Sequence, residues 1–128
     1  MRIFKNKAFS RFARKSRIDD SSLCKAVRDA ERGLLDADLG GGVIKQRVAR
    51  SGGGKSGGFR TLILFRMGIL AFFVHGFAKN EQDNIDDDDL VALRKLATTM
   101  LAYNDAALAS ALENKTLIEV ICDEKAIP

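Results

Sequence analysis

The sequence has 128 residues, 46% of them hydrophobic and 30% charged, which suits one domain with a buried core and excludes a disordered chain. Residues 1–80 contain 17 Lys and Arg against 6 Asp and Glu, whereas residues 81–128 contain 4 against 11. The resulting charges, +11 and −7, favour an anionic partner for the first segment, with nucleic acid ahead of an anionic membrane surface. The alternative is that these charges pair within the chain and keep it soluble.

Residue types also restrict metal chemistry and location. Cys24 and Cys122 are the two cysteines and His75 is the single histidine, so no usual spacing for a zinc site exists and no metal or cofactor is expected. We expect both cysteines to fill the core in a reducing compartment. The N-terminus lacks the apolar segment of a signal peptide, and the apolar stretch 62–77 is interrupted and too short to span a membrane. These features predict a soluble, cytoplasmic protein.

The first half of the chain predicts one short strand and two helices. Residues 2–5 form the expected strand, and residues 7–16, which are mostly cationic, suit a short basic helix. Residues 19–22 offer side chains that cap a second helix. Apolar residues then recur at helical spacing as far as Leu34, and Gly33 is the expected stop.

The segment DADLGGG, residues 36–42, is interpreted as a connection. Strands are then expected over residues 43–50, 59–67 and 69–79, with residues 51–58 as a loop and Gly68 in the last turn.

Beyond the sheet residues, negative charge gathers at residues 86–89, where the dipole of a following helix favours it. The apolar face of that helix is predicted to contain Leu90, Leu93, Leu96, Ala97, Met100 and Leu101. A shorter helix over 106–112 and a strand over 116–121 complete the expected elements.

The glycine-rich segment SGGGKSGG, residues 51–58, looks like a phosphate-binding loop. The P-loop pattern GxxxxGK[ST] requires a glycine where this chain has Ala49, and a helix after the loop to hold the phosphate. Residues 59–65 are instead rich in β-formers. We therefore expect a loop between two strands that carries Lys55, and no nucleotide-binding site.

Alternation along the hairpin of strands 59–67 and 69–79 places the charged side chains on one face. A two-residue turn at 67–68 would set Arg60 opposite His75. The resulting sheet surface is predicted to carry five basic or titratable residues, with Lys55 on the loop at its edge: Lys45, Arg47, Arg60, His75 and Lys79. A slip of one residue in the turn would remove this arrangement.

Two motifs suggest a family: GLLDADLGGGVIKQRVARSGGGKSGGFRTLILFR at residues 33–66, and AFFVHGFAKNEQDNI at residues 71–85. With GKSGGFR followed by GFAKNE, the chain resembles the RelE/HigB-like toxins of the RelE/ParE superfamily, from type II toxin–antitoxin modules of bacteria. The resemblance runs from about residue 4 to residue 119 and implies a single domain over 1–128. It implies an α+β fold, in which a twisted, mostly antiparallel sheet has N-terminal helices packed on one side and a C-terminal helical segment.

The resemblance also implies a function and partners. Toxins of this kind are metal-independent endoribonucleases that commonly cleave mRNA on the ribosome and so inhibit translation and growth. A cognate antitoxin, encoded next to the toxin, neutralises them, and operator DNA is contacted only through that antitoxin. No membrane is involved, in agreement with a location in the bacterial cytoplasm.

The chemistry of RNA cleavage fits the basic residues. RNA carries its own nucleophile, the 2′-OH, so an enzyme needs cations for the pentavalent phosphate and groups that transfer protons. We expect Arg60 and Lys55, which match motif positions of the family, to hold the scissile phosphate. Proton transfer is expected from His75 or Lys79.

The strand before the glycine-rich loop is expected to position the RNA backbone through Lys45, Arg47 and Arg50. The alternative is a non-catalytic nucleic-acid- or partner-binding module with the same fold. It is favoured by one departure from the family, since a basic residue is expected near Leu70 and this sequence has none.

Overall fold

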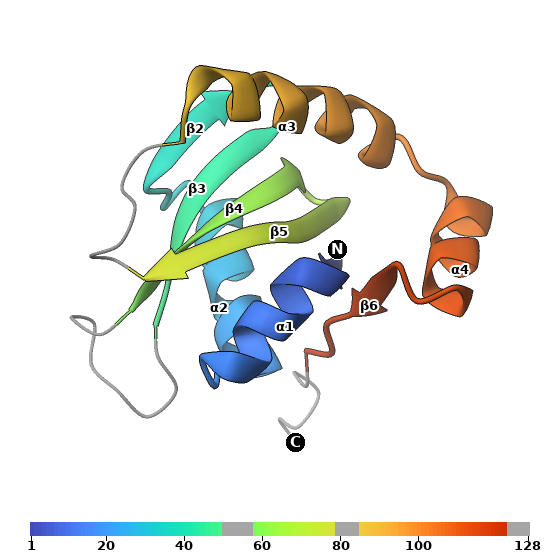
Figure 1. Cartoon of the computed structure of the whole chain (residues 1–128), viewed down its shortest axis with the longest axis horizontal. Coiled ribbons are helices and arrows are strands. Elements are labelled where there is room, and N and C mark those ends of the chain that lie inside the picture. The colour runs from blue at the N-terminus through green and yellow to red at the C-terminus, as the bar shows by residue number, and fades with distance from the viewer. Residues whose placement is uncertain (50–57, 79–84, 123–128) are drawn as a thin grey trace.

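The computed structural model describes residues 1–49, 58–78 and 85–122 of the chain. In chain order its elements are β1 (Arg2–Asn6), α1 (Lys7–Lys15), α2 (Asp20–Glu31), β2 (Ala37–Gly40), β3 (Val43–Val48), β4 (Phe59–Arg66), β5 (Leu70–Ala78), α3 (Asp87–Met100), α4 (Asp105–Glu113) and β6 (Leu117–Glu119) (Figure 1). Every element expected from the sequence is present, although the ends differ by a few residues. None of the helices in the described ranges is long and apolar enough to cross a membrane.

The strands form one sheet in the order β2-β3-β4-β5-β1-β6. β1 and β5 are parallel, and the other neighbouring pairs are antiparallel. The predicted α+β fold with a mostly antiparallel sheet is therefore confirmed. β2 corrects the prediction, because it lies in the segment interpreted as a connection. It is a four-residue edge strand with a register shift between Asp38 and Gly40, which leaves almost no alternation for a sequence pattern to reveal.

Helices pack on both faces of the sheet. One hydrophobic core lies between the sheet and helices α1 and α2, and a second lies between the opposite face and helices α3 and α4 (Figure 1). The N-terminal helices therefore share one side, as predicted. On α3, the buried residues Ala97 and Met100 confirm part of the expected apolar face, but Leu96 is 40% exposed and lies outside the core.

Two glycines after β2 allow α3 to pack closely against the sheet. Gly41 and Gly42 have φ values of +63° and +87°, in the left-handed region. An added Cβ would lie 2.8 Å from Cγ of Arg94 at Gly41 and 2.8 Å from Cδ1 of Leu101 at Gly42. Arg94 also donates from Nε to the carbonyl oxygen of Leu39 at 3.1 Å. This backbone therefore sets the position of α3 because it carries no side chains.

The predicted two-residue turn between β4 and β5 is wrong. Arg66 pairs with Leu70 across a three-residue turn, residues 67–69. Gly68 in this turn has a φ of +77°, the left-handed conformation that three-residue hairpin loops require and that glycine adopts without strain.

A β-bulge follows in the same hairpin. Ile63 pairs with Phe73 but Leu62 pairs with His75, so Val74 is an extra residue in β5. The longer turn alone would move the later side chains of β5 to the other face of the sheet, and the bulge moves them back. His75 therefore lies on the α3 side of the sheet, as Leu62 does.

Contacts from β1 and α1 hold the strand at and after the bulge. The side chain of Asn6 donates from Nδ2 to the carbonyl oxygen of Val74 at 3.4 Å, and its Oδ1 caps α1 by accepting from the backbone N–H of Phe9 at 2.8 Å. Gly76 lies against the ring of Phe12, where an added Cβ would be 2.3 Å from Cε2. A glycine at position 76 is thus what lets α1 approach this part of β5.

We predict that Gly76→Ala lowers the free energy of unfolding by about 1–3 kcal/mol, the usual cost of overpacking a core. Phe12→Ala removes the ring atoms with which the new methyl group would collide. The double variant Gly76→Ala/Phe12→Ala is therefore expected to be more stable than the sum of the two single effects predicts. Urea unfolding of the four proteins measures this coupling, and strict additivity would contradict the contact.

The C-terminal segment is attached to both β1 and α2. Arg2 donates to the carboxylate of Glu119 from Nε at 3.0 Å and from Nη2 at 2.9 Å, and these hydrogen bonds raise the pKa of Arg2. The backbone N–H of Val120 donates to the carbonyl oxygen of Ile3 at 2.8 Å. The next residue, Ile121, donates to Asp20 at 2.9 Å. Each of residues 119–121 therefore makes a hydrogen bond to β1 or α2.

The expectation of two separate cysteines in the core is wrong. Cys24 of α2 and Cys122 form a disulfide that joins residues 98 positions apart, with their Cα atoms 5.8 Å apart. Only Cys24 is deeply buried, at 2% exposure, whereas Cys122 packs against the edge of the first core. No sequence spacing could reveal this proximity, because it depends on where β6 pairs with β1.

Reduction of this disulfide is predicted to lower the free energy of unfolding by about 2–4 kcal/mol, because the cross-link closes a long loop in the unfolded chain. The double variant Cys24→Ser/Cys122→Ser should be destabilised by a similar amount. Thermal unfolding with and without dithiothreitol tests both statements. Dithiothreitol should lower the Tm of the wild type and leave that of the double variant unchanged; an equal response of both proteins would contradict the cross-link.

Candidate active site

The face of the sheet on the α3 side has a covered half and an open half. Under α3 and α4 its side chains are apolar and buried, for example Val43 and Leu64. Along β3 the side chains on this face then become half-buried at Lys45 and exposed at Arg47. Four residues of β3, β4 and β5 lie on the open half, which we call the basic face: Lys45, Arg47, Arg60 and His75. Alternation predicts their common face correctly, although the register differs.

The strand pairing brings two arginines together. Arg47 pairs directly with Arg60 across β3 and β4. Arg60 pairs with Phe77 on its other side, and the predicted pairing of Arg60 with His75 is wrong because the turn is longer and β5 carries a bulge. His75 pairs instead with Leu62, one residue pair along the same face. Two guanidinium groups and one imidazole thus share a small area.

An acidic residue neutralises part of this charge. Asp36, just before β2, accepts a hydrogen bond from Nη1 of Arg60 and forms an ion pair with it. Both side chains are about three-quarters buried, with exposed fractions of 21% for Arg60 and 25% for Asp36. Because like charges directly opposite on neighbouring strands repel, Asp36 offsets the repulsion between Arg60 and Arg47. Asp36 was not predicted from the sequence, in which it differs from its surroundings only as an acidic residue within a strongly basic segment.

A buried amide fixes the position of Asp36. Gln46 of β3 is 4% exposed and faces α2. Its Nε2 donates to the carbonyl oxygens of Ala26 at 3.0 Å and Leu34 at 2.9 Å, and its Oε1 accepts from the backbone N–H of Asp36 at 3.2 Å. Gln46 therefore ties α2 and the chain before β2 to the centre of the sheet, and it sets where the counter-ion of Arg60 lies.

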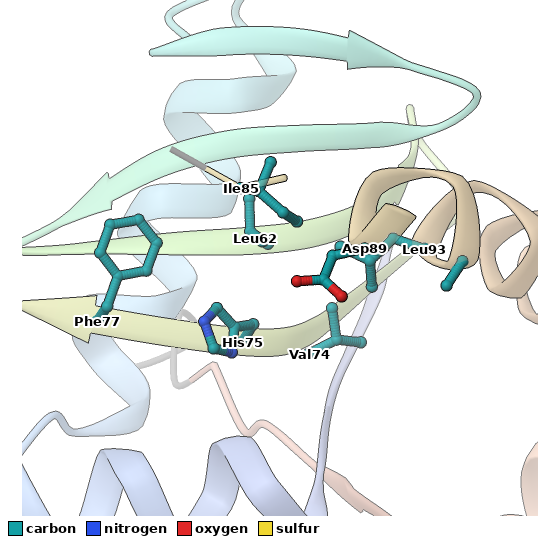
Figure 2. Close-up of a pocket in the computed structure, with 8 residues that line it drawn as sticks. Leu62, Val74, His75, Phe77, Ile85, Asp89 and Leu93 are labelled. Atoms are coloured by element: carbon teal, nitrogen blue, oxygen red, sulfur yellow. The ribbon is translucent and has the colours of Figure 1, made fainter. Parts of the chain in front are cut away.

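His75 borders a cavity of about 360 Å³ between the sheet and α3. The cavity is lined by Leu62, Val74, His75, Phe77, Ile85, Asp89, Ala92 and Leu93 (Figure 2). The imidazole is exposed and lies near the ring of Phe77, with 5.8 Å between the ring centroids. Figure 2 shows the carboxylate of Asp89 pointing from α3 toward the space between Leu62 and His75.

Three predicted site residues lie outside the described residues: Arg50, Lys55 and Lys79. The structure brings together the other four, Lys45, Arg47, Arg60 and His75. Within the described ranges, no three His, Cys, Asp or Glu side chains form a group that could hold a metal ion. The described residues of the basic face therefore offer a ligand three cationic side chains and one imidazole.

The fold agrees with the result of a comparison with protein families. A family model described as RelE toxin of RelE / RelB toxin-antitoxin system matches residues 1–120. The chain belongs to the RelE toxin family. As a RelE toxin it is a component of a toxin–antitoxin system, and the family implies an antitoxin partner. A search of curated proteins gives no significant match.

The position at which a basic residue is expected from the RelE resemblance lies in the core of this toxin. Leu70 is 3% exposed and belongs to the second hydrophobic core, with Phe4 and Phe72 among its members. A charge at this position would be buried without water and would cost several kcal/mol unless paired. Packing therefore explains why this chain has leucine here.

We predict that Gln46→Leu lowers the free energy of unfolding by about 2–4 kcal/mol, because one buried hydrogen bond to Ala26 and two part-buried ones to Leu34 and Asp36 are lost together. Thr61→Val is the matched control, since the Thr61 hydroxyl is also fully buried but donates only one hydrogen bond, at 2.9 Å to the carbonyl oxygen of Gln46. This variant should cost about 1 kcal/mol. Chemical unfolding ranks the two variants, and an equal or smaller effect of Gln46→Leu would contradict the proposed clamp.

Proposed function

We propose that this RelE toxin is a metal-independent endoribonuclease that cleaves mRNA, associated with the ribosome as is common among HigB-like toxins, and thereby inhibits translation and growth. Membership in the RelE family supports this function, because RelE toxins generally cleave mRNA. The structural observation that carries the proposal is the Arg47–Arg60 pair next to His75 on one open face. The proposed location is the bacterial cytoplasm, a reducing compartment in which the Cys24–Cys122 disulfide would be reduced.

In the proposed reaction the 2′-oxygen of a nucleotide attacks the adjacent phosphorus, and the bond from phosphorus to the 5′-oxygen breaks. The proton of the 2′-OH passes to a base, and an acid protonates the leaving 5′-oxygen. The products are a 2′,3′-cyclic phosphate and a 5′-hydroxyl end. Charge builds up on the equatorial oxygens of the phosphate, so cations fixed beside them lower the barrier.

The residues of the basic face have distinct roles in this proposal. Arg60 binds the scissile phosphate, because a guanidinium group can donate two parallel hydrogen bonds to it. Arg47, directly opposite, holds a phosphate oxygen of the same or the next nucleotide, and Lys45 positions the RNA backbone. His75 transfers a proton. The ion pair with Asp36 limits the rotamers of Arg60, so less side-chain entropy is lost when RNA binds.

Three residues outside the described part of the chain complete the proposal through their motif positions. Lys55, from the GKSGGFR motif, binds the scissile phosphate together with Arg60. Lys79, from the FAKNE motif, is the alternative to His75 for proton transfer. Arg50 extends the RNA-binding strand beyond Arg47.

For the antitoxin, we propose a protein encoded next to the toxin that lays an acidic or amphipathic segment over the basic face. Charge complementarity supports this arrangement, since residues 1–80 carry a net charge of +11. Operator DNA would be contacted only through the antitoxin. A complex whose interface avoids Arg47 and Arg60 would contradict inhibition by direct occlusion.

A non-catalytic RNA- or partner-binding module is the second candidate. The Asp36–Arg60 ion pair favours it, because an internal carboxylate already neutralises one of the two arginines. Incubation of the purified toxin with mRNA on ribosomes, and separately with free RNA in EDTA, separates the candidates. The ribonuclease leaves fragments with 2′,3′-cyclic phosphate ends in at least one of the two reactions, whereas the binding module leaves the RNA intact in both.

We predict that Arg60→Ala reduces the rate of cleavage at least about 100-fold, which is the scale for removing one donor that acts on a transition state. Arg60→Lys should recover only part of the activity, because lysine cannot donate two parallel hydrogen bonds. Arg11→Ala, which removes an exposed arginine of α1, is the control for loss of charge. Single-turnover rates of the three variants test the role, and full activity of Arg60→Ala would remove Arg60 from the site.

A further inference from the structure

The cavity between β5 and α3 lies next to the arginine pair on the same face of the sheet. Phe77, which lines it, pairs with Arg60 across the strands, and Leu62, also a lining residue, is two positions from Arg60 along β4. Residues two positions apart on a strand are separated by about 7 Å. A nucleotide whose phosphate is bound at Arg60 would therefore have this cavity within reach of its base.

The walls of the cavity suit a flat, partly apolar group. Leu62, Val74 and Phe77 are at most 7% exposed, so their positions are fixed by packing. The ring of Phe77 is tilted by 40° from that of His75, and Ile85 is a further apolar lining residue. A volume of about 360 Å³ is at the small end of the range for ligand pockets, about 300–1,000 Å³. A single nucleobase is a ligand of suitable size.

Two hydrogen-bonding groups, the imidazole of His75 and the carboxylate of Asp89, distinguish this cavity from a purely apolar one. The carboxylate of Asp89 points into it from the first turn of α3 (Figure 2). The backbone N–H of Asp89 donates to Oδ1 of the helix cap Asp86 at 2.9 Å, which fixes the backbone from which this exposed side chain projects. Within the part of the chain that the structure describes, the Asp89 carboxylate has no hydrogen-bond or ion-pair partner. With respect to the described residues, its two oxygens are therefore available as acceptors, side by side.

We propose that this cavity binds a guanine base of the RNA and that Asp89 selects it. The inference rests on the proposed ribonuclease function and names the substrate preference of the same face. Guanine presents two adjacent donors, N1–H and the N2 amino group, which match the two oxygens of a carboxylate. A paired arrangement of this kind contributes strongly to discrimination between bases.

The other bases present an acceptor where guanine presents a second donor. Adenine has its N6 amino group beside the N1 acceptor, and cytosine has its N4 amino group beside N3. Uracil has one N3–H donor between two carbonyl oxygens. Each of these bases would place an acceptor against one carboxylate oxygen of Asp89. That oxygen would then lose its bound water without gaining a hydrogen bond. The selectivity therefore follows from the type of group that α3 places in the cavity.

The charges around the cavity also orient the nucleotide. Asp86, Asp87 and Asp88 belong to the same end of α3, and they repel phosphate from that side. Arg47 and Arg60 attract phosphate on the other side of the cavity. A nucleotide is therefore bound with its base toward α3 and its phosphate toward the arginine pair, and the reverse orientation is disfavoured at both ends.

The test maps cleavage positions in an RNA of mixed sequence for three proteins, each the full chain: wild type, Asp89→Asn and Asp88→Asn. We expect the wild type to cut at least about tenfold more often where guanine occupies one fixed position relative to the cut. Asp89→Asn should lose this preference while it still cleaves. Asp88→Asn is the matched control, because it removes the same charge from the same turn of α3 at a residue that does not line the cavity, and it should keep the preference.

A binding measurement decides the inference even if no RNA is cleaved. Calorimetric titration with guanosine 3′-monophosphate and adenosine 3′-monophosphate should show tighter binding of the guanine nucleotide, by about tenfold, in the wild type and in Asp88→Asn, and no difference in Asp89→Asn. A wild type that binds the guanine nucleotide selectively but cleaves nothing overturns the ribonuclease function and supports the cavity. Cleavage without a preference at any position, or a preference that survives Asp89→Asn, overturns the assignment of guanine to this cavity.

Discussion

The hydrogen bond from Asn6 to the carbonyl oxygen of Val74 lies at the point on which the site depends. The acceptor, Val74, is the extra residue of β5, and this bulge decides which face of the sheet the following side chains occupy. With the three-residue turn and no bulge, His75 would point toward α1, and Gly76, which has no side chain, would lie beside Arg60 on the opposite face. The same Asn6 caps α1, so a single side chain couples the start of the first helix to the composition of the basic face.

A comparable constraint acts on the other border of the site. The glycines after β2 bring the backbone close to Arg94 and Leu101, and α3 therefore ends the covered half of the face at a fixed place. Apolar side chains occupy the sheet up to this boundary, and cations begin beyond it. The helix α3 therefore covers half of one face of the sheet. Its acidic first turn also places negative charge next to the positive surface of the other half. The position of one helix sets both the shape and the polarity of the cavity.

Local patterns in the sequence predicted the helices, five of the six strands and the common face of Lys45, Arg47, Arg60 and His75. Each of these depends on the period of side chains within one element, which the sequence contains directly. The turn length, the bulge, the edge strand β2 and the disulfide were wrong or missed, because they depend on contacts between distant segments. Asp36 and Gln46 belong to the same group: their importance comes from Arg60 and α2, which lie far from them along the chain. The two errors in the hairpin offset each other, which is why the predicted face is correct despite a wrong register.

The electrostatics of the RelE toxin act over two different distances. The +11 charge of residues 1–80 attracts any polyanion, the proposed RNA substrate included, but this attraction is screened over about 8 Å at physiological ionic strength and has no preferred orientation. Asp36 and Asp89 act at shorter range, one beside Arg60 and the other across the cavity from His75. Carboxylates on a basic face reduce its total affinity for a polyanion, but they restrict where a phosphate can lie. Between these two carboxylates, beside Arg47 and Arg60, a phosphate is attracted by the net charge and is not repelled by a nearby carboxylate.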